Sequence, residues 1–297
     1  MVAVVFGLSR NNMVIIKLKG GIGNQLFQYA FGRLFSITNK TEVKYYFPEV
    51  EGKDTQREYE LGSFNCHIDL ASTKDLEDSP FNRKPLCKIY RKIKDKLLGH
   101  HHIGYDKKSL ATKEKYLEGF WQSYKYLEPI KEILFKEITP KEPIEEKYSE
   151  LMELISQSNS VSLHIRRGDY VNDPKTKKHH LVFGLEYYAD ALKVISEKIP
   201  DPKVFVFSDD KEWAKKNLQV SLPTYYVSQP GMKDYEELLI MSKCKHNIIA
   251  NSSFSFWGAW LNQNAGKIVI APDKWNNKYD KEYRDLLPPD WIKISIR

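Results

Sequence analysis

The amino-acid sequence predicts an α/β protein with mainly parallel β-sheets. Short segments rich in Val, Ile and Phe alternate with longer segments whose apolar residues recur at helical spacing. A strand, a helix and a second strand in this order form a right-handed βαβ unit, in which the two strands lie parallel. Because the pattern repeats through the second half of the chain, we predict a doubly wound sheet there.

The composition is that of a packed globular protein with about two domains. Of the 297 residues, 41% are apolar and 29% are charged. A domain averages roughly 150 residues, so two domains are expected, and this apolar content excludes a disordered chain. The three cysteines are scattered and odd in number, which favours reduced thiols in the cytoplasm over a disulfide framework.

The N-terminal domain, expected over 13–150, opens with a β–turn–α–β unit. Its strands are predicted at Val14–Leu18 and Val43–Phe47, and its helix at Leu26–Thr38. The helix carries apolar residues on two sides, which predicts burial between layers, and Asn24 is the expected N-cap. Residues 1–12 are interpreted as an extension ahead of Met13.

A boundary between two domains is predicted close to Pro140 and Pro143. The preceding segment, from about 69, is charged and Lys-rich, and its weak periodicity favours helix. A helix at Ile144–Ile155 then leads into the C-terminal domain, which is expected over 151–297.

The C-terminal domain alternates regularly between strand and helix patterns. Strands are predicted at Val161–Ile165, Val204–Phe207, Thr224–Val227, Asn247–Ala250 and Lys267–Ala271, and helices at Leu185–Ile199, Lys211–Leu218, Asp234–Lys245 and Phe254–Asn264. In doubly wound sheets, ligands lie beyond the carboxyl ends of the strands. The residues that follow each strand are therefore the candidates for a functional site.

A histidine and two arginines stand at the end of the first of these strands. His164 and Arg166 share one side of the strand because side chains alternate, and Arg167 follows them. Planar guanidinium groups bind oxyanions with two hydrogen bonds, which suits a diphosphate, and Asp169 is close enough to orient one of them. The alternative is an ion pair of Arg167 with Asp169 at the surface, beside a buried structural His164.

Two acidic residues, Asp209 and Asp210, follow the strand at Val204–Phe207. An aspartate in this position could accept hydrogen bonds from a ribose or from a guanine edge, and Asp209 is the candidate. The alternative is that Asp210 or Ser208 only caps the helix that follows.

A polar turn, Asn251–Ser255, follows another strand and opens a helix. Its backbone N–H groups, its hydroxyls and the helix dipole favour an anion. The candidate ligand-binding residues of this turn are Asn251, Ser252, Ser253, Phe254 and Ser255. The alternative is a serine N-cap followed by aromatic residues of the core.

The turn after the first strand contains two glycines in the spacing of a dinucleotide-binding motif. Gly21 and Gly23 match the first two positions of GxGxxG, but Leu26 stands in the third. An NAD-dependent oxidoreductase is therefore an alternative that the motif supports only weakly. The sequence has no Asp-x-Asp pair, and we expect neither a metal nor a cofactor.

The net charge of +7 is concentrated in one segment. Arg83–Lys96 contains seven basic residues and one acidic residue, so the remainder is nearly balanced, which argues against a nucleic-acid-binding face. Leu86 and Ile93, with their apolar neighbours at helical spacing, could form a helix that contacts a membrane surface. An ordinary amphipathic helix with a solvated basic face is equally compatible, and a non-enzymatic polyanion binder is a further alternative.

Three motifs together resemble the alpha-1,2-fucosyltransferases of glycosyltransferase family 11. They are Gly20–Ala30, His164–Tyr170 and Asn251–Gly258, and the closing segment Pro288–Ile292 agrees with them. The resemblance extends from Met13 to the end of the chain, although the region from about 65 to 145 carries none of the motifs.

The resemblance implies a GT-B-like pair of Rossmann-like domains whose sheets face each other across a cleft. It implies transfer of L-fucose from GDP-fucose, with inversion and without a metal, to the 2-hydroxyl of a terminal galactose in an oligosaccharide. The C-terminal domain would bind GDP-fucose, and the N-terminal domain would lie on the acceptor side. Such an enzyme would be cytoplasmic, with a possible peripheral membrane contact through Arg83–Lys96.

The resemblance also assigns roles to individual residues. His164, Arg166 and Arg167 would contact GDP, Asp209 would contact guanine, and Ser252–Ser255 would contact the phosphates. Asn24 and Gln25, with Gly21 and Gly23, would face the reacting centre or the acceptor. Arg166 would stabilise the departing diphosphate. Asp169 is a candidate general base, a role that competes with orienting an arginine.

Overall fold

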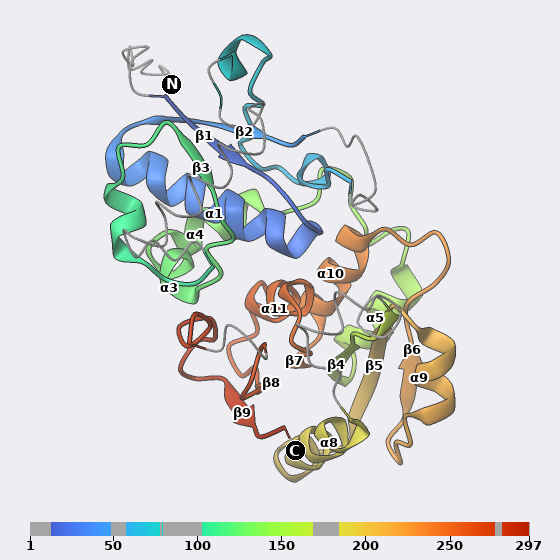
Figure 1. Cartoon of the computed structure of the whole chain (residues 1–297). Helices are drawn as coiled ribbons and strands as arrows, with labels where there is room; N and C mark the ends of the chain where they lie inside the picture. Colours follow the sequence, from blue (N-terminus) through green and yellow to red (C-terminus); the bar gives the residue numbers. More distant parts are fainter. Residues whose placement is uncertain are drawn as a thin grey trace. The chain divides into compact units, whose positions relative to one another are not determined.

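The chain forms two compact units, Met1–Thr139 and Pro140–Arg297, in the computed structural model (Figure 1). The structure describes residues 13–48, 58–77, 79, 103–168, 184–276 and 281–296. The division between Thr139 and Pro140 falls in the predicted proline-containing segment, N-terminal to the expected position between 150 and 151. The two units are called the N-terminal unit and the C-terminal unit below.

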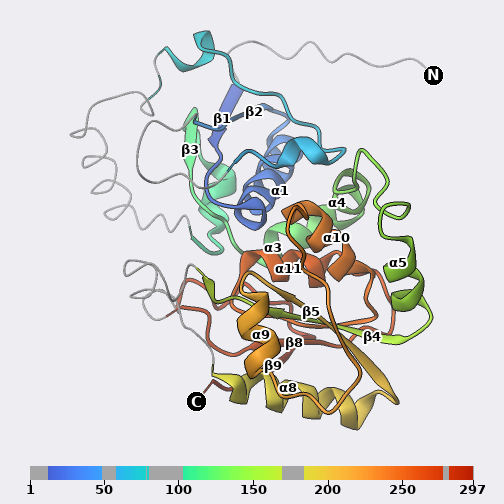
Figure 2. The same ribbon diagram turned by 90° about the vertical axis from the view of Figure 1, so that its right-hand side faces the viewer.

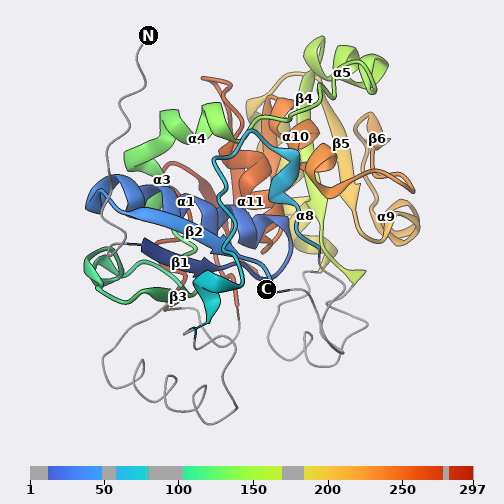
Figure 3. The same ribbon diagram turned by 90° about the horizontal axis from the view of Figure 1, so that it is seen from above.

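The N-terminal unit contains a three-stranded parallel sheet in the order β2-β1-β3. The strands are β1 (Met13–Lys17), β2 (Glu42–Tyr46) and β3 (Tyr116–Glu118), and the long helix α1 (Ile22–Asn39) packs beside them (Figure 3). The remaining described elements of this unit are short: η1 (Leu61–Ser63), η2 (Lys74–Leu76), η4 (Lys107–Ala111), α3 (Tyr124–Leu127), η5 (Glu128–Ile130) and α4 (Lys131–Glu137).

Helix α1 is buried on both sides, as its two apolar faces predict. Phe31 stacks on Trp121 with ring centroids 4.1 Å apart, and it meets Tyr126 edge-on at 5.3 Å. The predicted start of this helix is wrong, because α1 begins at Ile22 with Gly21 as its N-cap. Asn24 therefore lies in the first turn of the helix.

A buried carboxylate joins the last helix of the N-terminal unit to α1. Glu137, at the end of α4, accepts hydrogen bonds from Arg33 Nε at 3.0 Å and Arg33 Nη2 at 2.7 Å, and from the Tyr29 hydroxyl at 2.5 Å. A bidentate, charge-assisted contact of this kind has both geometric specificity and strength. It fixes the unit's last helix before the chain passes to the C-terminal unit.

Residues 69–143 were predicted to be helical, but the described part of this region (69–77, 79 and 103–143) is mixed rather than largely helical. It contains β3 and several turns, with α3 and α4 as its described α-helices. A strand of three residues is too short to show a period of two, so the sequence pattern could not indicate β3. The predicted helix at Ile144–Ile155 begins later, as α5 (Ser149–Ser156).

The C-terminal unit contains a six-stranded parallel sheet in the order β6-β5-β4-β7-β8-β9. Its strands are β4 (Asn159–Ile165), β5 (Pro202–Ser208), β6 (Thr224–Tyr226), β7 (His246–Ile248), β8 (Val269–Pro272) and β9 (Ile292–Ile294). Besides α5, the helices in its described residues are α8 (Leu185–Lys198), α9 (Lys211–Asn217), α10 (Asp234–Lys243) and α11 (Ser253–Trp260). The prediction of a doubly wound parallel sheet is confirmed for this unit, and β9 is a strand that we did not predict.

The direction of winding reverses at β4. From β4 the chain proceeds through β5 to β6 at one edge, and it then returns to β7 on the other side of β4. Helix α8 covers one face of the sheet, and α10 and α11 cover the other (Figure 2). The crevice at such a topological switch point, beyond the carboxyl ends of the strands, is where open α/β sheets bind ligands.

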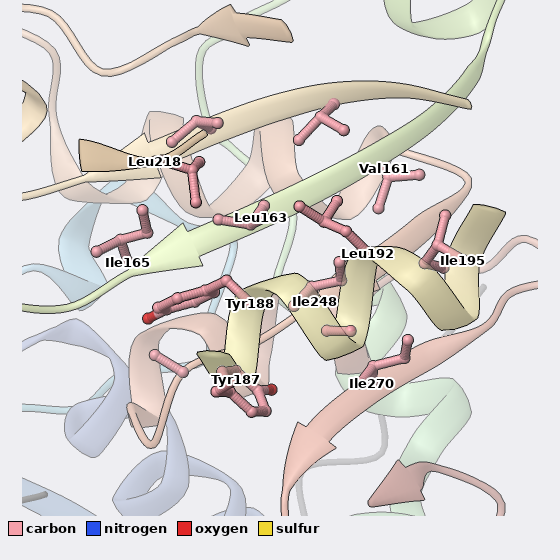
Figure 4. Packing of buried hydrophobic residues seen from close by; sticks show 14 of the residues in the cluster. Val161, Leu163, Ile165, Tyr187, Tyr188, Leu192, Ile195, Leu218, Ile248 and Ile270 are labelled. Atoms are coloured by element: carbon pink, nitrogen blue, oxygen red, sulfur yellow. The ribbon is translucent and has the colours of Figure 1, made fainter. Parts of the chain in front are cut away.

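The alternation of side chains on β4 connects the core to the switch point. Val161, Leu163 and Ile165 point toward α8 and pack in one cluster with Tyr188 and Leu192, among others (Figure 4). Burying an aliphatic side chain of this kind stabilises the fold by about 1.5–3 kcal/mol. His164 therefore points to the opposite layer, the one that contains α10 and α11.

The helices of that opposite layer pack closely. A Cβ atom at Gly258 of α11 would lie 2.9 Å from Cβ of Met241 on α10, a distance that real side chains do not adopt. The glycine thus sets the spacing of α10 and α11. None of the helices in the described ranges has both the length and the hydropathy that crossing a bilayer requires.

Candidate functional site

The register between β4 and β5 brings the arginines and the aspartates together. Ile165 at the end of β4 lies opposite Ser208 at the end of β5. Arg166 and Arg167 follow the first strand, and the two aspartates follow the second. Because the strands are parallel, all four side chains emerge at the same edge of the sheet.

Asp209 contacts both arginines at the end of β4. Its Oδ2 lies 3.2 Å from Arg166 Nε, and its Oδ1 accepts a hydrogen bond from the backbone N–H of Arg167 at 2.9 Å. A Cβ atom at Gly168 would lie 3.1 Å from Asp209 Oδ2, so the absence of a side chain there lets the carboxylate approach. Asp209 therefore fixes both the backbone and one guanidinium at the end of β4.

The predicted orienting partner, Asp169, lies outside the described residues, and in the described structure Asp209 orients Arg166. The contact of Asp209 with guanine or ribose stays a prediction. Asp210 caps α9, as the structural alternative proposed, by accepting a hydrogen bond from the backbone N–H of Trp213 at 3.2 Å. Its Oδ2 also lies 3.7 Å from Arg167 Nε.

His164 is a buried, neutral imidazole at the switch point. Its side chain is 3% exposed, and its ring centroid lies 5.4 Å from that of Phe254 in α11. Burial, together with the positive charge of Arg166, lowers the pKa of His164 to about 3. Within the described part of the chain, its Nδ1 atom has no hydrogen-bond partner. A buried polar atom of this kind is costly unless another group satisfies it, which a bound ligand could do.

The Asn251–Ser255 turn lies next to β7 and opens α11. Ser252 is the N-cap, and the helix has eight residues. Asn251 is buried and donates a hydrogen bond to the Trp275 carbonyl at 3.1 Å. Ser253 and Phe254 are partly exposed. The backbone N–H groups of the first turn point away from the helix, as an anion site requires.

Ser255 has a side chain engaged within the protein, and its contact with a ligand stays a prediction. Ser255 is completely buried, and its hydroxyl donates to the carbonyls of Ala250 and Ser252, each at 3.3 Å. Its position in the first turn of a short helix points it back into the protein. The prediction that the later aromatic residues belong to the core is confirmed for Phe256 and Trp257, which are fully buried.

Sequence reasoning missed a carboxyl group beside the arginine–aspartate cluster. Glu237 lies in the first turn of α10 and accepts a hydrogen bond from the Ser228 hydroxyl at 3.1 Å. The same hydroxyl accepts a hydrogen bond from the backbone N–H of Ser208 at the end of β5. A signal was present, because Ser228 follows a predicted strand and therefore belongs to the same edge of the sheet.

The environment of Glu237 favours its protonated form. The pKa of Glu237 is raised to about 7, chiefly by burial. The charges of Asp234 and Asp209 contribute to the rise, while the Ser228 hydrogen bond and Arg166 act in the opposite direction. The interactions with Asp209 and Arg166 show that this carboxyl group lies within electrostatic range of the cluster.

The glycine turn of the N-terminal unit contains amide side chains with different roles. Gln25 is completely buried; its Nε2 donates to the carbonyls of Gly20 and Glu58, and its Oε1 accepts from the N–H of Glu60. The prediction that Gln25 faces the reacting centre or the acceptor stays a prediction; in this structure its amide binds backbone groups. Asn24 is only partly buried and accepts a hydrogen bond from Gln122 at 2.6 Å.

The two glycines of the broken GxGxxG pattern lie at the start of α1. Gly21 is the N-cap and Gly23 is buried in the first turn, while Gly20 has the positive φ of 79° that a turn needs here. Among the described residues, no three His, Cys, Asp or Glu side chains come together as a metal site. The expectation of a metal-free reaction stays a prediction, and Arg83–Lys96 lies outside the described residues.

Solved structures with the same architecture show the class of fold. The chain matches the fucosyltransferase NodZ from Bradyrhizobium with a TM-score of 0.51 and 12% identity, over 84% of this chain and 92% of that one. It matches an Arabidopsis thaliana FUT1 mutant in complex with GDP with a TM-score of 0.52 and 12% identity, over 88% and 70% of the two chains. At these identities the likeness concerns the fold, which is α/β and GT-B-like, as predicted.

The sequence comparison gives the family. Residues 8–295 match the profile of Glycosyl transferase family 11. The chain belongs to this family and is a glycosyltransferase. It is 33% identical to the O-antigen biosynthesis glycosyltransferase WbnK of Escherichia coli, over 93% of this chain and 99% of that protein.

Two further relatives carry more specific names. An alpha-1,2-colitosyltransferase of Escherichia coli is 33% identical, over 96% of this chain and 99% of its own length. The galactoside 2-alpha-L-fucosyltransferase Sec1 of Mus musculus is 25% identical, over 97% of this chain and 75% of its own length. The resemblance to alpha-1,2-fucosyltransferases of family 11 is thus confirmed at the level of the family.

The raised pKa of Glu237 predicts how its substitution changes stability with pH. Between about 4.5 and 7, the folded protein keeps a proton on Glu237 that the unfolded chain has released, so this residue lowers stability as the pH rises. Glu237→Gln removes the effect. Relative to the wild type, the variant should gain on the order of 2 kcal/mol of unfolding free energy between pH 5 and pH 8. Urea unfolding at several pH values measures the difference.

His164 affects the pH dependence of stability with the opposite sign, because its pKa in the folded protein is depressed. The stability that depends on its neutral form is present above pH 6.5 and is lost as the pH falls below that value. That contribution is common to both proteins and cancels in the comparison. Glu212→Gln is the matched control, since the Glu212 side chain is 84% exposed. If the unfolding free energies of Glu237→Gln and the wild type changed with pH in parallel, the burial of this carboxyl group would be contradicted.

Proposed function

We propose that the protein transfers a 6-deoxy sugar, L-fucose or a close analogue, from its GDP-activated form to the 2-hydroxyl of a terminal galactose in a glycan. Membership of family 11 supports glycosyl transfer. The names of two relatives, an alpha-1,2-colitosyltransferase and a galactoside 2-alpha-L-fucosyltransferase, agree on the linkage and differ in the sugar. One crystal structure is of NodZ, which shares the fold, soaked with GDP-fucose.

The observation that carries this proposal is the arginine pair at the switch point. Asp209 and Asp210 hold Arg166 and Arg167 at the end of β4. The amide-lined start of α11 follows β7, the strand on the other side of β4. Both features favour oxyanions. A diphosphate beyond the end of β4 would meet guanidinium groups from one strand and N–H groups from the next.

The proposed reaction is a single displacement with inversion. The 2-hydroxyl oxygen of galactose attacks C1 of the sugar while the bond from C1 to the diphosphate oxygen breaks, and GDP departs with the electron pair. Negative charge grows on the diphosphate as this bond lengthens. Fixed N–H donors that are already oriented toward that charge stabilise the transition state without reorganisation, and Arg166 is the principal candidate.

The proton of the attacking hydroxyl needs an acceptor. His164 can accept a hydrogen bond or donate one as a neutral imidazole, but it is too deeply buried to hold a positive charge at neutral pH. Asp209 is engaged with Arg166 and with a backbone N–H. We retain Asp169 as the proposed general base, since neither of these groups is as suitable.

The N-terminal unit is proposed to bind the acceptor glycan. Asn24 is only partly buried and remains the proposed acceptor contact of the glycine turn. We further propose that the enzyme works in the cytoplasm, where its scattered thiols stay reduced, and that Arg83–Lys96 contacts a membrane surface at which glycan acceptors are presented.

Removal of the Arg166 guanidinium should impair turnover more than binding. Arg166→Ala is expected to lower kcat about 10²-fold or more, because the lost interaction acts on charge that develops in the transition state. Transfer from GDP-fucose to lactose, followed by chromatography of the product, measures it. Arg284→Ala is the control, since Arg284 is exposed. Near-normal turnover of Arg166→Ala would contradict the proposed role.

Chelation of divalent metals should leave the reaction unchanged. The proposed stabilisation of the diphosphate uses guanidinium and backbone N–H groups, so dialysis against EDTA should not lower the initial rate. Mg²⁺ or Mn²⁺ added back should not raise it. A complete loss of activity that either ion restores would overturn the proposal that arginines take the place of a metal.

Ligand-dependent stabilisation distinguishes the proposed donor from the alternatives. At about 100 times its Kd, a ligand of the folded state adds about 2.7 kcal/mol of stability. GDP-fucose or GDP-colitose should therefore raise the melting temperature, and NAD should not. Stabilisation by NAD alone would favour an oxidoreductase. Salt-sensitive retention on heparin without a response to GDP would favour a polyanion binder.

A further inference from the structure

The indole of Trp213 lies against the guanidinium of Arg167. Trp213 is in the first turn of α9, and Arg167 Cζ lies 4.1 Å from the centroid of its ring. A guanidinium over a tryptophan face at this distance is held by cation–π attraction. Trp213 itself packs against the hydrophobic cluster on the α8 side of the sheet. The ring is therefore anchored in the core on one side and supports the arginine on the other.

Asp210 fixes the same arrangement from a second direction. Its Oδ1 accepts the N–H of Trp213, which sets the start of α9, and its own N–H donates to the Ser208 hydroxyl at 3.0 Å. Its Oδ2 lies 3.7 Å from Arg167 Nε. One carboxylate thus positions both the backbone of the tryptophan and the Nε edge of the guanidinium.

The two contacts leave the outer edge of the guanidinium open. The ring occupies one face of Arg167 and Asp210 lies at its Nε edge, whereas in the described chain the Nη atoms have no hydrogen-bond partner. Arg166 differs, because its Nε faces Asp209. The Nη fork of an arginine is the part that binds an oxyanion with two hydrogen bonds.

We propose that Trp213 is a positioning residue, which holds Arg167 with its Nη fork directed at the diphosphate of the nucleotide donor. This inference rests on the proposed function and adds a residue outside the three sequence motifs. The long arginine side chain has many rotamers in solution, and ordering it lowers affinity. A ring that restricts these rotamers in the free protein strengthens phosphate binding without touching the ligand.

Calorimetric binding of GDP and of guanosine separates this role from a structural one. Trp213→Leu keeps an apolar side chain in the core and removes the π face. It should weaken GDP binding about 3- to 10-fold and leave guanosine binding unchanged, because guanosine has no phosphate for Arg167 to bind. Trp213→Phe keeps an aromatic face and should recover most of the affinity for GDP.

A double-mutant cycle tests whether Trp213 acts through Arg167. Once Arg167→Ala has removed the guanidinium, the additional substitution Trp213→Leu should not lower the affinity for GDP any further. Lys216→Ala, on the same helix, is the control for α9 and should bind GDP as the wild type does. Steady-state kinetics should show the loss in KM for the donor rather than in kcat.

The outcomes separate the two proposals. If Trp213→Leu weakened the binding of GDP and of guanosine equally, Trp213 would have a structural role. The same would follow if the losses of GDP affinity in the double mutant were additive. Either result would overturn this inference alone. If Trp213→Leu does not fold, the same comparison of GDP with guanosine binding is made with Trp213→Phe, alone and combined with Arg167→Ala. If the wild-type protein itself binds neither GDP nor GDP-fucose, the proposed function fails instead.

Discussion

The structure of the candidate site depends on the pairing of two arginines with two aspartates across neighbouring strands. Two positive side chains at the end of one strand repel each other and would be free to point into solvent. The register of β4 with β5 places a carboxylate beside each of them. Asp209 also binds the backbone N–H of Arg167, so the path of the chain and the direction of Arg166 are fixed by the same group. A pair held in this way is oriented before any ligand arrives, which is the condition under which electrostatic stabilisation is effective.

The topology explains why this pairing occurs at a place suited to a ligand. The winding of the sheet reverses at β4, so helices leave β5 and β7 toward opposite faces, and open α/β sheets bind ligands beyond the strand ends at such a switch point. His164 points into the layer of α10 and α11 because its neighbours Leu163 and Ile165 are needed in the core beneath α8. The same alternation that builds the hydrophobic core thus brings a polar group to the switch point.

The sequence predicted most of the strands and the residues that follow them, because β-branched and apolar residues are concentrated in buried strands, although β3 and β9 were not predicted. It could not predict contacts that depend on register or on distant backbone. The partner of Arg166 is Asp209 rather than a residue near it in sequence, since the β4–β5 register decides the neighbour. Gln25 binds the backbone of Glu58 and Glu60, which no local pattern indicates. Glu237 resembles an ordinary acidic residue at a helix start, and only its contact with Ser228 reveals its environment.

The charges of the cluster nearly cancel, and this bears on how it would recognise an anion. Arg166 and Arg167 are matched by Asp209 and Asp210, His164 is neutral, and the raised pKa of Glu237 leaves this carboxyl group only partly ionised at neutral pH. The concentration of basic residues in Arg83–Lys96 is separate from this cluster in the sequence. Among the described residues, attraction for a diphosphate therefore cannot arise from an excess of positive charge. It arises from N–H groups whose directions are fixed, which favour an oxyanion of matching geometry over anions in general. The selectivity of such a site depends on the groups that hold its arginines in position. The Trp213 ring, which lies against the guanidinium of Arg167, is one of these groups.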